Sequence, residues 1–151
     1  MVRIPNLIAG VLLGALLATL AASQDAPTSR FITLPGRSDD LPYSDAVLVG
    51  NTVYLAGDLG IDPQTGAPPP VIEDEIRIVL DGMKRRLEMV GMTMDDLVAV
   101  EVFCPDLSLY EQFNAVYRTY FTAGFPARAF IGSGPLLLGG HFEVKGIAVK
   151  R

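Results

Sequence analysis

The alternation of apolar and polar positions along the chain predicts several strands and two helices. Apolar stretches rich in β-branched residues are typical of strands, and they occur at 30–34, 46–50, 52–57, 98–104, 127–131 and 141–149. Gly50-Asn51, between the second and third of these stretches, predicts a tight hairpin. The stretch VAVEVFC at 98–104 is apolar at nearly every position, which is typical of a central strand.

After Val71 the apolar positions recur at helical spacing instead, at Ile72, Ile76, Val79, Leu80, Met83, Leu87 and Val90. Acidic residues crowd the start of this predicted helix and basic residues its end, which suits the helix dipole: Glu73, Asp74, Glu75, then Lys84, Arg85 and Arg86. We expect these charges to form a solvated face, and Gly91 to end the helix.

A second helix is predicted near residue 108. Ser108 and Glu111 have the spacing of a capping box, and the apolar stripe that follows is Leu109, Phe113, Val116, Tyr117 and Tyr120. The resulting order, β-β-β-α-β-α-β-β, predicts an α+β fold: a two-layer sandwich with a mixed β-sheet and two helices on one face. The uncovered face of so apolar a sheet predicts an oligomer.

The N-terminal segment differs from the rest of the chain. Arg3 precedes an apolar run from Leu7 to Ala22, which is followed by the small-residue step Ala21-Ala22-Ser23. This order predicts a signal peptide at 1–23, cleaved after Ser23, and therefore a periplasmic or secreted protein without stable membrane association. An uncleaved signal anchor is the alternative. Residues 24–40 are then a lead-in with the first strand, and 41–151 form the main domain.

Composition excludes several classes of function. The formal net charge of −5 and the lack of a basic run argue against nucleic-acid binding. The single cysteine, Cys104, cannot form a disulfide within the chain. We interpret it as a buried core thiol, with a reactive nucleophile as the minor alternative. No motif has the spacing of metal ligands, so the sequence predicts no metal site.

Arg128 and Glu143 are the candidate functional residues of the C-terminal third. Each lies in a predicted strand that is mostly apolar, and the two residues would come close if these strands were neighbours. A guanidinium in an apolar cleft suits a bound carboxylate, but the residues alone favour a structural Arg–Glu salt bridge, because such pairs are common. By strand alternation His141 shares the face of Glu143 and is a weak candidate. Asn114 interrupts the apolar side of the second helix, where it contacts a ligand or backbone, or faces water.

Four segments resemble the Rid family of reactive-intermediate deaminases, also called RidA or YjgF-type proteins. They are LPYSDAVLVGNTVYLAGDLGIDPQTG, VFCPDLSLYEQFNAVYRTYF, FPARAF and FEVKGIAV, and the resemblance covers about 41–149. It implies a chorismate-mutase-like fold, a homotrimer with clefts between subunits, and no cofactor. The implied activity is hydrolysis of 2-imino and 2-enamino acids, such as 2-aminoacrylate and its tautomer 2-iminopropanoate, to 2-keto acids and ammonia.

The resemblance also assigns roles by position. It implies that Arg128 holds the substrate carboxylate, that Glu143 positions or activates water, and that Tyr43 and Asn114 line the cleft. Two positions depart from the family pattern, because Ala56 replaces a common Ser and Phe130 a common Cys. A phenylalanine at 130 is expected to narrow the pocket or favour a bulkier, more apolar substrate.

Three functions therefore remain open from the sequence. The leading one is an exported imine/enamine deaminase acting on a small carboxylate-bearing substrate. The alternatives are a non-enzymatic protein of the same fold that binds small carboxylates or acts like a chaperone, and a purely structural trimer. Ala56 and Phe130 favour a non-enzymatic protein, whereas Arg128 and Glu143 favour an enzyme.

Overall fold

The fold was determined as a computed structural model, and the structure describes residues 28–38 and 40–151. The predicted signal peptide lies outside the described residues. Among the helices that are described, none is long and apolar enough to cross a membrane.

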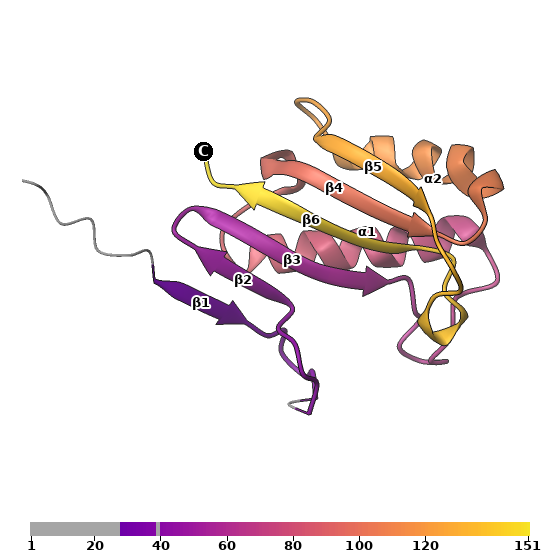
Figure 1. Cartoon of the computed structure of the whole chain (residues 1–151), viewed down its shortest axis with the longest axis horizontal. Coiled ribbons are helices and arrows are strands. Elements are labelled where there is room, and N and C mark those ends of the chain that lie inside the picture. Colours follow the sequence, from indigo (N-terminus) through magenta and orange to yellow (C-terminus); the bar gives the residue numbers. More distant parts are fainter. Residues whose placement is uncertain (1–27, 39) are drawn as a thin grey trace, which may run out of the picture.

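A mixed β-sheet is the centre of the fold (Figure 1). In the described part of the chain it has six strands in the order β1-β2-β3-β6-β4-β5. Their bounds are Ser29–Ile32 (β1), Ala46–Val49 (β2), Thr52–Leu59 (β3), Leu97–Cys104 (β4), Ala127–Gly132 (β5) and Glu143–Val149 (β6). Neighbouring strands are antiparallel except β4 and β5, which are parallel and therefore need the crossover that the second helix provides.

Two helices cover one face of this sheet, behind it in the view of Figure 1. They are α1 (Ile72–Glu88) and the shorter α2 (Tyr110–Tyr117), which has a 3₁₀ turn at each end. The core lies between the layers, and its largest fully buried apolar side chains include Phe113, Phe142, Ile76, Leu80, Met83 and Leu87. The predicted α+β two-layer sandwich is confirmed.

Glycines end two elements as the sequence predicts. Gly50 has a φ of +60° at the tip of the β2–β3 hairpin, where its missing Cβ permits the left-handed conformation. Gly91 has a φ of +69° and follows α1 in the same way.

Two predictions about the helices are wrong. The charges of α1 are not all solvated, because Glu75 is 0% exposed and Arg86 only 7% exposed. Both lie on the side of α1 that faces the sheet, where each has polar partners. The capping box of Ser108 and Glu111 does not form either: Asp106 caps this end, its Oδ1 accepting the backbone N–H of Ser108 at 2.9 Å.

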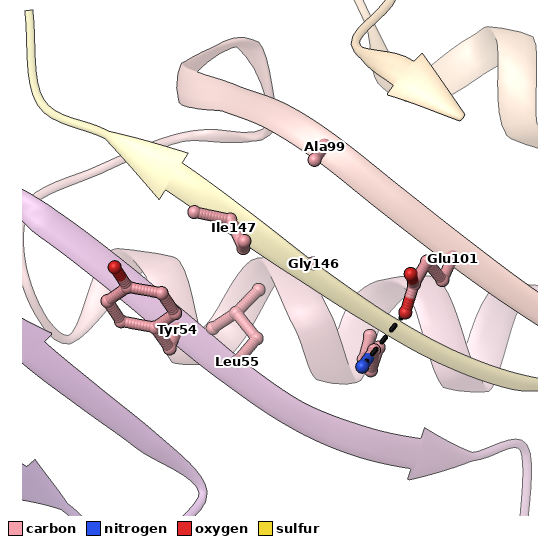
Figure 2. Close-up of a pocket in the computed structure, with 7 residues that line it drawn as sticks. Tyr54, Leu55, Ala99, Glu101, Gly146 and Ile147 are labelled. Carbon is pink, nitrogen blue, oxygen red and sulfur yellow. Dashed lines mark ion pairs between the residues drawn. The ribbon is translucent and has the colours of Figure 1, made fainter. Parts of the chain in front are cut away.

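The other face of the sheet is not covered by α1 or α2. Along the strands, residues that point to this face alternate with residues that are buried under the helices, and they include both apolar and charged side chains. Figure 2 shows its central hollow, where Tyr54 lies opposite Ile147, and the Glu101 carboxylate pairs with Lys145 Nζ at 2.8 Å. Tyr54 is 49% exposed, although it lies in β3, an inner strand of the sheet. In the described chain this face is not covered by either helix, which is the feature that predicted an oligomer.

Candidate active site

Arg128 lies on β5 and extends toward α2. Its Nη2 donates a hydrogen bond to the side-chain oxygen of Asn114 at 2.7 Å. Asn114 is only 7% exposed, which excludes the alternative that this residue faces water. The amide holds the guanidinium by one nitrogen and leaves the remaining donors for another group.

Aromatic rings surround the same guanidinium. The Arg128 Cζ atom lies 4.6 Å from the ring centroid of Tyr117, and 5.7 to 5.8 Å from three others, those of Tyr110, Phe113 and Phe130. The faces of the rings attract the positive charge of the guanidinium, and their packing restricts the conformations of the Arg128 side chain. Burial raises the pKa of Tyr117 to about 12, although the positive charge of Arg128 acts to lower it. The phenol of Tyr117 is therefore neutral at physiological pH.

A cavity of about 200 Å³ opens beside Arg128. It is lined by Asn114, Tyr117, Arg118, Phe125, Pro126 and Arg128. These residues include two arginines and no acid. The Tyr117 hydroxyl is buried and has no hydrogen-bond partner among the described residues. A cavity with cationic and neutral donors and an apolar wall suits an organic anion.

Glu143 belongs to a different cavity, of about 540 Å³, around the end of β3. Tyr43, Ala56 and Glu143 line it together, so three of the predicted site residues do meet. Tyr43 is 55% exposed, and its ring lies under the guanidinium of Arg37, with Cζ 4.4 Å from the centroid. Leu137 and Leu138 form an exposed apolar wall of the same cavity.

Gly57 is a residue of this cavity that the sequence analysis missed. A Cβ built at this position would lie 2.1 Å from Glu143 Oε1, so only glycine admits the carboxylate against the β3 backbone. The register between β3 and β6 shifts at this point, between Leu55 and Asp58. A glycine inside an apolar strand pattern was the available signal, because it often marks a bulge or a close approach.

Arg128 and Glu143 do not come together within one chain, contrary to the expectation of neighbouring strands. β4 lies between β5 and β6, and Arg128 contacts α2, whereas Glu143 projects from the face opposite the buried Val144. Among the described residues neither forms a salt bridge with the other. The intrachain Arg–Glu salt bridge is therefore excluded, and each residue borders its own cavity.

The prediction that His141 shares the strand face of Glu143 is also wrong. β6 begins at Glu143, so His141 precedes the strand instead of sharing the face of Glu143. Its backbone and ring contact Glu75 on α1 instead.

A buried ionic network supports the cavity that contains Glu143. Arg86 on α1 pairs with Asp58 and, at 3.5 Å, with Asp45, whose other oxygen lies 3.1 Å from Arg37. Asp45 also accepts the backbone N–H of Leu34 at 2.7 Å. Because buried charges need partners, the network fixes the start of β2, the end of β3 and α1 relative to one another.

Cys104 is a core residue and not a nucleophile in this geometry. It is 0% exposed, its Sγ–H donates to the Asp106 carbonyl at 3.0 Å, and burial raises the pKa of its thiol. We expect the native protein to react with a thiol reagent such as 5,5′-dithiobis(2-nitrobenzoate) at pH 8 at least about 100-fold more slowly than the unfolded chain. Absorbance at 412 nm with and without denaturant measures both rates, and equal rates would contradict the buried assignment.

Comparison with known proteins places this geometry in a family. A family model described as Endoribonuclease L-PSP matches residues 38–150. The 2-iminobutanoate/2-iminopropanoate deaminase of Bos taurus is 36% identical over 110 residues, covering 72% of this chain and 80% of the relative.

Solved structures agree with this result. RidA from the Antarctic bacterium Psychrobacter sp. PAMC 21119 superposes with a TM-score of 0.73 at 31% identity, covering 80% of this chain and 99% of that one. Escherichia coli TdcF with bound serine superposes with a TM-score of 0.74 at 28% identity, covering 81% and 99%. With its sheet, its helices and most of its length matched, the chain belongs to the Rid/YjgF family, the L-PSP family of the matching model.

Proposed function

We propose that the protein hydrolyses reactive 2-imino and 2-enamino acids to 2-keto acids and ammonia. The observation that carries the proposal is Arg128, which Asn114 and four aromatic rings hold at a cavity whose lining contains no acid. Such a guanidinium binds a carboxylate through two parallel hydrogen bonds. The name of the bovine relative supports the same substrate class.

The proposed reaction needs only water and these side chains. Arg128 orients the substrate by its carboxylate, and Glu143 accepts a proton from water as the water oxygen bonds to the carbon of the C=N group. The nitrogen is protonated in this step or from Glu143 afterwards. The C–N bond then breaks, ammonia leaves with the electron pair, and the hydroxyl proton is lost as the 2-keto acid forms. No atom is oxidised, so the reaction requires no redox group.

We infer that the site is complete only between copies of the chain. Arg128 and Glu143 border separate cavities, and the sheet face in Figure 2 is left open by the helices. A homotrimer that buries this face and joins the Arg128 cavity of one copy to the Glu143 cavity of the next satisfies both observations. The arrangement is the one that the family resemblance implies.

Mixed trimers test this arrangement. Arg128→Ala and Glu143→Gln chains, each inactive alone, are expected to regain activity when they are unfolded together and refolded. In a cyclic trimer every mixed assembly contains one interface with both native residues, so random mixing restores about a quarter of wild-type activity. Separately refolded and then combined trimers are the control. No recovery in the mixture would contradict a site shared between copies.

Imine trapping tests the reaction itself. An amino-acid oxidase generates imines in situ from a panel of amino acids, and semicarbazide traps them as semicarbazones that absorb in the ultraviolet. The mature protein is expected to lower the semicarbazone signal for at least one amino acid, with 2-keto acid and ammonia formed in equal amounts. An unchanged signal with every amino acid would overturn the deaminase assignment.

Binding without hydrolysis is the second candidate function, because Ala56 lines the cavity of Glu143, at a position where the family resemblance implies a serine. In that case the cavities hold a small carboxylate that is not consumed. Isothermal titration with pyruvate or serine that shows binding, together with unchanged semicarbazone formation, would favour it.

We further propose that the chain acts outside the cytosol, in the periplasm or as a secreted protein, on the evidence of the predicted signal peptide at 1–23. Expression of the full-length chain in a Gram-negative host, followed by fractionation and N-terminal sequencing, tests the proposal. A mature N-terminus at Gln24 in the periplasmic fraction is expected. Retention of the uncleaved chain in the membrane fraction would favour the signal anchor.

Phe130→Cys tests how the aromatic cluster holds Arg128. The ring of Phe130 packs edge-to-face on Tyr110, with centroids 5.0 Å apart, and on Phe113 at 5.4 Å. We expect its loss to destabilise the protein by about 1–3 kcal/mol and to raise KM several-fold, because the guanidinium gains freedom. Thermal unfolding and imine-trapping kinetics measure the two effects. Met89→Ala, exposed at the end of α1, is the control. A substrate range that widens toward larger imines instead would show that Phe130 narrows the pocket.

A further inference from the structure

Glu75 is a buried acid for which the proposed reaction has no direct use. It lies on the first turn of α1 and is 0% exposed. Its Oε1 accepts the backbone N–H groups of His141 at 2.6 Å and of Phe142 at 3.2 Å, and its Oε2 lies 2.7 Å from Nδ1 of the His141 ring. A fully buried carboxylate with three such contacts holds the segment that it binds at a defined position.

The segment held by Glu75 leads directly into the proposed catalytic acid. His141 and Phe142 immediately precede Glu143, which is the first residue of β6. The opposite strand is fixed as well, because Leu59 pairs with Glu143 and the next residue, Gly60, packs on Glu75: a Cβ at Gly60 would lie 2.4 Å from Glu75 Cγ. Glu75 therefore contacts the backbone on both sides of the carboxylate of Glu143.

The loop before His141 needs such an anchor. Leu138 has a φ of +57°, a conformation that a residue with a branched side chain rarely adopts, and Gly139 follows with a φ of +75°. Leu137 and Leu138 are exposed and line the cavity of Glu143. The hydrogen bonds to Glu75 end this strained turn and return the chain to the sheet.

His141 and the backbone amides share the negative charge of Glu75. The imidazole side chain is 44% exposed at the protein surface and forms an ion pair with Glu75 when it is protonated. The backbone donors of His141 and Phe142 remain in either protonation state of the ring. For this reason the positioning of the segment depends on the oxygen acceptor at residue 75 more than on its charge.

We propose that Glu75 is a positioning residue that acts through these amides to place the Glu143 carboxylate, an inference that rests on the proposed function. Glu75→Met removes the acceptors but keeps the length of the side chain. Glu75→Gln keeps an oxygen for the two backbone N–H groups. A displacement of about 1 Å at a catalytic group lowers turnover by about 100-fold.

Steady-state kinetics with the best imine substrate supply the first test. Glu75→Met is expected to lower kcat by about 100-fold with KM within about twofold, because Arg128 still binds the substrate carboxylate. Glu75→Gln is expected to restore kcat to within about threefold of wild type, and Asp74→Ala, exposed on the same turn, to change neither constant. Unchanged kcat in Glu75→Met, or a parallel rise in KM, would overturn the proposal. If that variant does not fold, Glu75→Asp keeps the charge but draws the carboxylate back by one methylene group, and it is expected to reproduce the selective loss of kcat. Unchanged kcat in Glu75→Asp would then overturn the proposal.

Amide hydrogen exchange separates this proposal from the proposed function. The amides of His141 and Phe142 are expected to be protected in the wild type and in Glu75→Gln, and to exchange at least about tenfold faster in Glu75→Met. If the wild type hydrolyses no imine, the deaminase assignment fails and exchange alone decides whether Glu75 anchors the segment. Equal exchange in all three proteins would overturn the anchoring whether or not the protein is an enzyme.

Discussion

Arg128→Ala is expected to lower kcat/KM for the best imine substrate by about 100- to 1,000-fold. The guanidinium is the positive charge that Asn114 and the aromatic rings hold at the edge of an acid-free cavity. Truncation of one member of a desolvated charged pair costs about 3–4 kcal/mol, which corresponds to this loss. The effect is expected mainly in KM, with a smaller fall in kcat, because the carboxylate contact is made in the bound substrate and in the transition state alike.

Two further variants make the result specific to the fork of Arg128. Arg128→Lys keeps the charge but loses the bidentate geometry, and we expect it to recover only part of the activity. Arg85→Ala removes an exposed arginine from α1 and should leave kinetics unchanged. Full activity in Arg128→Ala, with folding and oligomeric state intact, would show that the carboxylate binds elsewhere.

Glu143→Gln is expected to lower kcat by about 100- to 10,000-fold while KM stays within a few-fold of wild type. Glutamine has nearly the same shape, so it preserves the fit against Gly57, where a Cβ would lie 2.1 Å from the carboxylate. It does not accept a proton from water, and general base catalysis contributes about this much to hydrolytic reactions. Single-turnover and steady-state imine trapping separate the chemical step from binding.

The controls for Glu143 follow from its surroundings. Glu111→Gln removes an exposed acid from α2 and is expected to have no effect. Gly57→Ala is expected to displace the carboxylate and to lower kcat as Glu143→Gln does. A Glu143→Gln protein with half or more of wild-type kcat would assign the activation of water to another group.

The family resemblance was readable from the sequence because the residues that carry it are local in the chain. Segments such as FPARAF and FEVKGIAV place Arg128 and Glu143 in strands, and the periodicity of 71–90 identifies the buried side of α1. The site was less predictable. The sequence left open whether Asn114 belongs to the site or faces water. Only the packing of α2 against β5 revealed its hydrogen bond with Arg128.

Long-range order explains the errors. The sequence allowed the strands of Arg128 and Glu143 to be neighbours, but the parallel crossover through α2 places β4 between them. His141 was assigned to a strand face by alternation, whereas the strand begins two residues later. Alternation gives the face of a residue only inside a strand, and it contains no information on where pairing starts.

The sequence by itself determined the elements of this protein, because hydrophobic periodicity, the hairpin at Gly50 and the stop at Gly91 act over a few residues. Tertiary structure decided which charges are buried. Glu75 and Arg86 read as parts of a solvated helix face, yet both lie in the interior, since the amides of His141 and Phe142 and the carboxylates of Asp45 and Asp58 approach them from segments distant in the chain. A buried charge is stable only with its partners in place, and the sheet order and the packing of α1 bring those partners together.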